Sequence, residues 1–275
     1  MTEASKPNLV HEALSKAPQA TLMFWVVKIC ATTVGETGGD AVSMTLKLGY
    51  LTATYIFLAF FVVTLAFQVG AKRYHPVIYW LVVVATTTVG TTTSDFIDRT
   101  LKLGYPLSSA MLLTLVVAVL IVWRLASGKI AADKITTRKD EVFYWLTILV
   151  SNTLGTALGD FTSETLPDLM DKVAKAPAGG WDPWGFELAA VMFAGLIAIV
   201  ALLHVFKLAP QAVLFWAAYV LTRPLGATLG DTLTKPHAQG GLNLDRIMAT
   251  AAIGAAMVVL ILLTPKLRRP AAAQA

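Results

Sequence analysis

Long apolar runs alternate with short polar segments along the whole chain, and this pattern predicts a bundle of membrane-spanning helices. A helix needs about 20 apolar residues to cross a hydrocarbon core of roughly 30 Å. Runs of that length fall near residues 20–39, 51–69, 77–96, 107–125, 142–161, 186–206, 211–230 and 246–263. The sequence therefore predicts an all-α membrane protein with eight transmembrane helices, built as a single membrane domain with residues 1–19 as a cytoplasmic tail.

An aromatic pair, a glycine and an aspartate recur four times along these runs at constant spacing. The copies are Phe24-Trp25 with Gly35 and Asp40, Tyr79-Trp80 with Gly90 and Asp95, Tyr144-Trp145 with Gly155 and Asp160, and Phe215-Trp216 with Gly226 and Asp231. This periodicity predicts four tandem two-helix repeats over residues 20–73, 75–128, 140–208 and 211–269. Since two helices return the chain to the same side, the repeats are expected to be related by an axis along the membrane normal.

The first helix of each repeat carries polar side chains four residues apart, which places them on one face of the helix. The columns are Thr32, Glu36 and Asp40; Thr87, Thr91 and Asp95; Asn152, Thr156 and Asp160; and Arg223, Ala227 and Asp231. Carboxylates in a membrane cost several kcal/mol unless they face a bundle interior or water. We therefore expect the four aspartates and Glu36 to meet around a common wet cavity.

Charge within this cavity favours a bound cation. Five acids face only two bases, Lys28 and Arg223, which leaves a formal excess of three negative charges. Carboxylate, hydroxyl and amide oxygens are the ligands of hard ions such as Mg²⁺, Ca²⁺ and Mn²⁺. The expected metal ligands are Asp40, Asp95, Asp160, Asp231 and Glu36. Side chains expected along the cation path or behind the ligands are Thr32, Thr33, Thr87, Thr88, Thr91, Asn152, Thr153, Thr156, Lys28 and Arg223.

Three features of the motif leave alternatives open. The glycines Gly35, Gly90, Gly155 and Gly226 are predicted either to break the helices, so that backbone carbonyls join the ligands, or to let helices pack closely. The aspartates have a second interpretation as caps of the outer helix ends among lipid headgroups. The motif tryptophans are expected to mark the cytoplasmic interface of the membrane, where tryptophan is enriched, and the alternative is that they are binding residues.

Composition and charge support the membrane assignment and orient the chain. Of the 275 residues 56% are hydrophobic and 14% charged, against about 25% charged in soluble domains. Thirteen lysines and arginines lie on the side that holds both termini and seven on the other, which places both termini in the cytoplasm. The net charge of +5 therefore belongs to connecting segments and predicts no nucleic-acid partner.

The string Phe24-Trp25, Lys28, Thr32 to Thr37 and Asp40, with its weaker copies, resembles a family of bacterial proteins. These are integral membrane proteins known chiefly as uncharacterised membrane-anchored proteins, and the resemblance covers nearly the whole chain. A weaker likeness is to exporters and exchangers of Ca²⁺ and Mn²⁺, whose repeated helices carry a Glu-x-Gly-Asp signature. The segment from Glu36 to Asp40 is similar to that signature but one residue longer, and the later copies lack the glutamate.

Together these observations predict a transporter for a hard divalent cation in a bacterial inner membrane, with export by proton exchange favoured from the exporter likeness. No permanently bound cofactor is expected, and no enzyme activity, because no nucleophile or cofactor loop accompanies the aspartates. A monomer is favoured, since four repeats in one chain can enclose a path, and a homo-oligomer stays possible.

Two other classes of function remain open. One is a cation channel that uses the aspartate ring as its selectivity element; Thr33-Val34-Gly35 and Thr88-Val89-Gly90 are similar to the filter strand of potassium channels. The other is a membrane sensor or assembly factor, in which the acids form structural salt bridges with Lys28 and Arg223.

Overall fold

The computed structural model describes residues 16–71, 73–130, 135, 137–165 and 185–267, and every long element in this part is a helix. The long helices are α2 (Leu22–Asp40), α3 (Tyr50–Gly70), α4 (Pro76–Asp95), α5 (Tyr105–Ser127), α6 (Arg138–Asp160), α8 (Gly185–Val205), α9 (Gln211–Thr234) and α10 (Arg246–Leu267). They coincide with the eight apolar runs, which confirms the all-α prediction. Most of the predicted tail, up to residue 15, lies outside the described residues.

Seven of these helices, rather than the predicted eight, are long and apolar enough to cross a membrane. The exception is α2, whose 19 residues include Lys28, Glu36 and Asp40. Burial explains how a helix of this composition fits the bundle. The three charged side chains lie inside the protein, with relative exposures of 0–3%. The charges that lower the hydropathy of α2 therefore do not face lipid.

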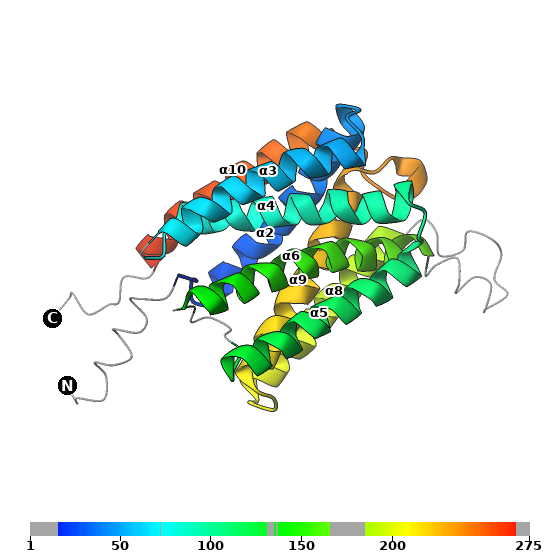
Figure 1. Ribbon diagram of the computed structural model, residues 1–275. Helices are drawn as coiled ribbons and strands as arrows, with labels where there is room; N and C mark the ends of the chain where they lie inside the picture. Colours follow the sequence, from blue (N-terminus) through cyan, green and yellow to red (C-terminus); the bar gives the residue numbers. More distant parts are fainter. Residues whose placement is uncertain (1–15, 72, 131–134, 136, 166–184, 268–275) are drawn as a thin grey trace, which may run out of the picture.

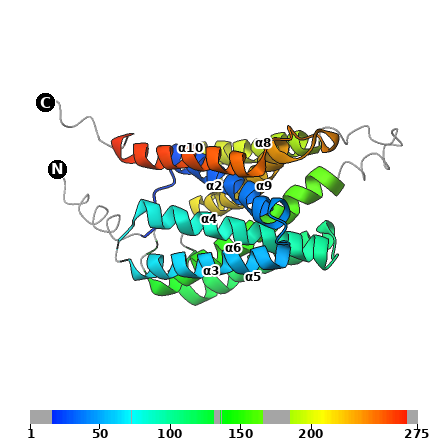
Figure 2. The ribbon, with the colours of Figure 1, turned by 90° about the horizontal axis from the view of Figure 1, so that it is seen from above.

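The helices form a ring of four surrounded by four others. Helices α2, α4, α6 and α9, the first helices of the four repeats, pack side by side in a closed ring in which α9 returns to α2. Outside it, α3 packs on α4, α5 on α6, α8 on α9 and α10 on α2, as Figures 1 and 2 allow the reader to follow. Each outer helix thus packs mainly on the motif helix of the next repeat, and the last repeat closes on the first.

Burial separates the two sets of helices clearly. Within the spans, 72% of α4 and α6 and 67% of α9 is buried, against 17% of α3 and 11% of α10. The outer helices present their large apolar side chains outward, as expected where the surrounding solvent is hydrocarbon. The polar motif is therefore held in the inner ring by helices that contribute mainly apolar surface.

The motif glycines bring neighbouring helices of the ring into close contact, and the helices run through them without interruption. The alternative of helix breaks at Gly35, Gly90, Gly155 and Gly226 is therefore wrong. A Cβ atom on Gly35 would lie 2.2 Å from Thr87 Oγ1, and one on Gly226 would lie 2.1 Å from Thr32 Oγ1. Gly90 meets Asn152 and Gly155 meets Arg223 in the same way. Each motif glycine thus packs against one residue of the next repeat. That residue lies three positions before the motif glycine of its own repeat.

The backbone changes after three of the four aspartates instead. A π-helical turn follows α2, α4 and α6, as η2 (Ala41–Thr45), η3 (Phe96–Thr100) and η4 (Phe161–Thr165), whereas α9 continues to Thr234 and is followed by the short 3₁₀ helix η6 (His237–Gln239). Residues 166–184, the centre of the longest predicted loop, lie outside the described part. The π turns carry side chains of this end of the bundle, Arg99 among them, toward the aspartates.

Candidate functional site

Aromatic side chains close one end of the ring. Near the start of each motif helix, an aromatic residue packs on the tryptophan of the next repeat. The pairs are Phe24 with Trp80, Tyr79 with Trp145, Tyr144 with Trp216 and Phe215 with Trp25, with ring centroids 5.5–5.7 Å apart. We call these eight residues the aromatic ring, and the end of the bundle that holds them the aromatic end.

Burial of the aromatic ring corrects the interpretation of its tryptophans. Trp80, Trp145 and Trp216 are only 3–5% exposed, and Trp25 is half-buried. Three of the four therefore do not reach lipid headgroups, as interface anchors must. The physical reason is that the same amphipathic ring that suits a membrane interface also fills the space between helices and forms edge and tilted contacts with other rings.

One hydrogen bond inside the aromatic ring gives a direct test of its packing. The hydroxyls of Tyr79 and Tyr144 lie 2.7 Å apart, and both side chains are buried. We expect Tyr79→Phe to lower the free energy of unfolding by about 1 kcal/mol, because the hydroxyl of Tyr144 loses this partner in a dry environment. Tyr55→Phe, at an exposed position on α3, is the control and should have no measurable effect. Unfolding in detergent micelles, followed by tryptophan fluorescence, measures both; equal stability of the two variants would contradict the expectation.

Beyond the aromatic ring, Lys28 is buried completely in the interior. Its ammonium donates to Asn152 Oδ1 at 3.4 Å and lies 4.3 Å from the centroid of the Tyr219 ring. Asn152 in turn donates to the hydroxyl of Thr86 at 3.0 Å. Within the described part of the chain no carboxylate lies within ion-pair distance of Lys28. The lysine does not snorkel to an interface; amide oxygen and an aromatic face are its contacts.

The next layer joins Arg223 to Glu36. Arg223 Nη2 donates to Glu36 Oε2 at 2.9 Å, and to the hydroxyls of Thr91 and Thr156. Both charged side chains are nearly inaccessible, with side-chain exposures of 0% and 4%. Each of the four helices of the ring therefore contributes one side chain to this buried polar cluster. The cluster holds the guanidinium of Arg223 at the level of the motif glycines.

The four aspartates are joined in two pairs, each bridged by one basic side chain. Lys235 Nζ lies 3.4 Å from Asp40 and 3.3 Å from Asp231. Arg99 lies 3.0 Å from Asp95 and 3.7 Å from Asp160, and also pairs with Glu164 at 2.9 Å. We call this the aspartate end of the bundle. Its ring is therefore not four equivalent carboxyl groups.

Electrostatics keeps Lys235 charged in this position. Burial lowers the pKa of its ammonium, but the carboxylates of Asp231 and Asp40 raise it by more, so that the pKa lies well above the ordinary lysine value. The side chain is only 7% exposed. The ammonium thus lies between two carboxylates of different repeats, and their charges favour its protonated form.

These bridges correct the charge balance predicted from sequence. Arg99, Lys235 and Arg246 belong to the seven bases that the sequence places on the side away from the termini. All three lie within ion-pair distance of the motif aspartates; Arg246 is 3.6 Å from Asp40. Each of the five acids expected as ligands therefore has a basic partner, and the three added bases offset the excess of three negative charges counted among those acids. A cation that enters this region has to take the place of a base rather than fill a deficit.

Three carboxylates nevertheless gather closely enough to bind one ion. Oxygens of Glu36, Asp40 and Asp231 all lie within 4.8 Å of one another, and the three side chains are buried. They come from α2 and α9, at the closure between the last repeat and the first. We call them the carboxylate cluster. Asp95 and Asp160, also expected as ligands, pair with Arg99 and lie outside this cluster.

The hydroxyl groups expected beside the acids divide into two sets. Thr91 donates to Glu36 at 3.3 Å, and Thr156 accepts from Arg223. Thr33, Thr88 and Thr153 instead donate to backbone carbonyls of their own helices, three or four residues earlier. The hydroxyls of Thr32 and Thr87 also lie 2.8 Å from carbonyl oxygens of their own helices. In addition, each lies 3.2 Å from a carbonyl oxygen of the adjacent helix, that of Thr222 or Ala31. Thr91, Thr156 and Asn152 are thus the neutral groups that contact the charged side chains.

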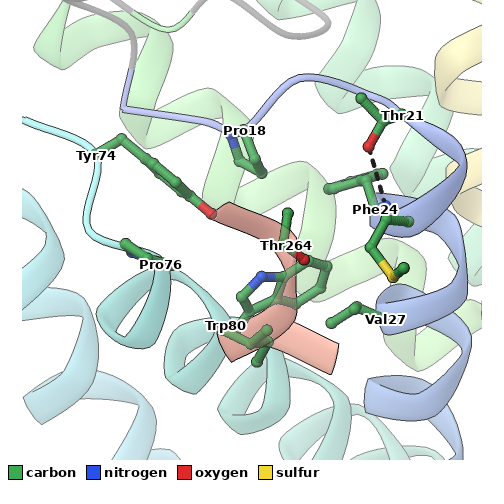
Figure 3. Close-up of a pocket in the computed structure, with 10 residues that line it drawn as sticks. Pro18, Thr21, Phe24, Val27, Tyr74, Pro76, Trp80 and Thr264 are labelled. Atoms are coloured by element: carbon green, nitrogen blue, oxygen red, sulfur yellow. Dashed lines mark hydrogen bonds between the residues drawn. The ribbon is translucent and has the colours of Figure 1, made fainter. Parts of the chain in front are cut away.

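A pocket of about 130 Å³ lies at the aromatic end, away from the carboxylates (Figure 3). Its walls come from α2, α4, α10 and the segments before α2 and α4, and they include Phe24, Val27, Tyr74, Trp80, Ile261 and Thr264. None of the residues predicted as ligands lines it. Phe24 and Trp80 belong to the aromatic ring, so the pocket borders the closed end of the bundle and is not the candidate cation site.

The sequence contained a signal for the two bridging bases, Arg99 and Lys235, which were not predicted to lie beside the aspartates. Each follows a motif aspartate by about one helical turn. Arg99 follows Asp95 by four residues, and Lys235 follows Asp231 by four. The other two repeats carry Met44 and Glu164 at that position. Residues four apart share a helix face, so the pairing inside each repeat was readable. The second partner of each base, in another repeat, was not.

Comparison with known proteins identifies the family. The Repeat of Unknown Function, DUF347, matches residues 23–74, 78–129, 143–207 and 214–269, and the chain belongs to this family. The four matches confirm the internal repeat and the resemblance to a four-repeat membrane family. Neither the comparison with curated proteins nor that with solved structures gives a significant match, so the likeness to Ca²⁺ and Mn²⁺ exporters gains no support from them.

Proposed function

We propose that this protein is a membrane carrier for a hard divalent cation, Mn²⁺, Ca²⁺ or Mg²⁺, with the carboxylate cluster as its binding site. The observation that carries the proposal is the convergence of Glu36, Asp40 and Asp231 to within 4.8 Å inside the ring of motif helices. Three carboxylates in a buried site are costly to maintain and form a suitable ligand set for such ions. The hydroxyl of Thr91, which donates to Glu36, offers a further oxygen.

Closure at both ends of the ring favours a carrier over a continuously open pore. The aromatic ring packs across one end. At the other end, Lys235 and Arg99 bridge the aspartates. A carrier needs such an occluded arrangement, whereas a channel with the aspartates as its selectivity element needs a continuous water path. In the carrier, Asp95 and Asp160 are assigned to proton exchange, and export follows from the exporter likeness of residues 36–40.

A bacterial inner membrane as the location is supported by the likeness to a family of bacterial membrane proteins. The distribution of lysine and arginine supports an orientation with both termini in the cytoplasm. In that orientation the aromatic end faces the cytoplasm and the aspartate end faces outward. The closed ring of four repeats within one chain supports a monomer as the working unit.

Flux into proteoliposomes tests the carrier proposal. We expect saturable Mn²⁺ uptake by the wild-type protein and at least a tenfold loss of uptake in Asp231→Asn and Glu36→Gln, because each substitution removes a charged ligand. The matched control is Asp98→Asn, a buried acid at the same end that lies outside the cluster and contacts Ser94. Equal flux in all four proteins would contradict the proposal, and flux that does not saturate would favour a channel.

A second candidate function rests on the ion pairs themselves. Arg223 pairs with Glu36, and Lys235 bridges Asp40 and Asp231, so these ion pairs join the last repeat to the first. In a sensor or assembly factor that transports nothing, such ion pairs would serve only to stabilise the fold. Absence of flux for Mn²⁺, Ca²⁺ and Mg²⁺ in folded wild-type protein, combined with loss of stability in Asp231→Asn, would favour this function.

A further inference from the structure

Lys235 lies at the aspartate end of the carboxylate cluster. It is the first residue after α9, and its ammonium lies 3.3 Å from Asp231 and 3.4 Å from Asp40, two of the three acids of the cluster. Glu36, the third acid, is held from the other side by Arg223. The cluster is therefore enclosed by the guanidinium of Arg223 toward the glycine level. At the aspartate end it is enclosed by the ammonium of Lys235 and by the guanidinium of Arg246, which lies 3.6 Å from Asp40.

Arg223 and Lys235, the bases on the two sides of the cluster, differ in their freedom to move. Arg223 lies within α9, is 0% exposed and donates to Glu36, Thr91 and Thr156. Lys235 lies beyond the helix end, with an extended backbone, and its contacts of 3.3–3.4 Å are longer than well-formed charged hydrogen bonds. A lysine ammonium is also a compact charge on a flexible stem. The guanidinium of Arg223 is held through Nη2, which makes all three contacts, in a fully buried position. Lys235 is thus the base that can leave the cluster without disrupting the ring.

We propose that Lys235 is a tethered counter-cation, which occupies the carboxylate cluster when no cargo is bound and is displaced when the divalent cation enters from the aspartate end. This inference rests on the proposed function and assigns a specific role to one residue of its site. Together with Arg246, the ammonium balances the charges of Asp40 and Asp231 in the cargo-free protein, and it also blocks the route to them. Cation binding and release of Lys235 are then the same event, which couples opening of this end to cargo.

Because Lys235 and the divalent cation compete for the same carboxylates, the lysine weakens cation binding by a measurable factor. If the lysine-free state is about a tenth of the population, the apparent dissociation constant is about tenfold above the intrinsic one. Removing the ammonium should therefore tighten cation binding about tenfold. Purely structural ion pairs have the opposite signature, since their removal weakens the fold and the site together.

Calorimetric titration of the purified full-length protein with Mn²⁺ provides the test. We expect Lys235→Met to lower the apparent dissociation constant about tenfold, and Lys235→Arg, which keeps a charge, to stay close to wild type. Lys47→Met is the matched control, because Lys47 is an exposed lysine in the turn after η2 with no ion pair in the described structure. Unchanged or weaker Mn²⁺ binding by Lys235→Met would overturn the inference.

Thermal unfolding with and without Mn²⁺ keeps the inference testable if Lys235→Met is unstable. The expected result is that Mn²⁺ raises the melting temperature of Lys235→Met more than that of wild type, since the ion takes the place of the ammonium. A variant that stays unfolded at all Mn²⁺ concentrations would overturn it. Failure of the proposed function is distinct: Mn²⁺ then binds neither wild type nor Lys235→Met, or binds equally well to Asp231→Asn.

Discussion

Arg223→Met should destabilise the protein by about 3–5 kcal/mol, the largest change we expect from any single substitution. Removing one partner of a buried ion pair leaves the other charge uncompensated, which costs that much in proteins. Here the residue left behind is Glu36, 3% exposed, and Thr91 and Thr156 lose a donor as well. Equilibrium unfolding in mixed micelles, followed by tryptophan fluorescence, measures the loss.

A double variant separates the charge effect from simple loss of packing. Arg223→Met combined with Glu36→Gln removes both charges and should recover most of the lost stability, because a neutral pair has no buried charge to solvate. Arg138→Met is the control at an exposed position and should change stability by less than about 0.5 kcal/mol. If the single variant is as stable as this control, the ion pair with Glu36 is not part of the folded protein.

Gly226→Ala is expected to destabilise the ring by about 1–3 kcal/mol through overpacking. The added Cβ would lie 2.5 Å from Thr32 Cβ and 3.0 Å from the backbone carbon of Thr32. Rotation of the threonine side chain cannot relieve these contacts, so α9 and α2 have to separate. Both the closure of the ring and the spacing of the carboxylate cluster depend on that contact.

The control for the glycine prediction is chemically identical but lies in open space. A Cβ atom added to Gly254, in α10, would meet no atom within 4 Å, and alanine forms helices better than glycine by about 1 kcal/mol. Gly254→Ala should therefore leave stability unchanged or raise it. Thermal unfolding monitored by size-exclusion chromatography in detergent compares the two variants. Equal melting temperatures would show that the close approach at Gly226 is not required.

The sequence was sufficient to predict the helices and the repeat, because both depend on local features. Apolar runs of spanning length locate the helices within a few residues, and the spacing of the glycines identifies the helices of the inner ring. The choice between helix break and close packing required the neighbouring helix. Gly35 contacts Thr87, a residue of the next repeat, and only the ring geometry brings the two together.

The charge balance could not be predicted from sequence for a similar reason. Lys235 and Asp40 are separated by 195 residues and meet only because the last repeat closes on the first. The sequence counts Arg99 and Arg246 among the bases on the side away from the termini, although their side chains reach back into the bundle. Long basic side chains at helix ends extend well beyond the position of their backbone. Hydropathy alone therefore underestimates the number of bases inside.

The two bridging bases follow a two-fold arrangement rather than the four-fold arrangement of the repeats. Lys235 joins the fourth repeat to the first, and Arg99 joins the second to the third. Both bridges therefore cross from the first half of the chain to the second, at opposite seams of the ring. A polypeptide of two repeats, paired with a second copy by a two-fold rotation, would build the same seams. The chain has the geometry of a dimer whose subunits have been fused.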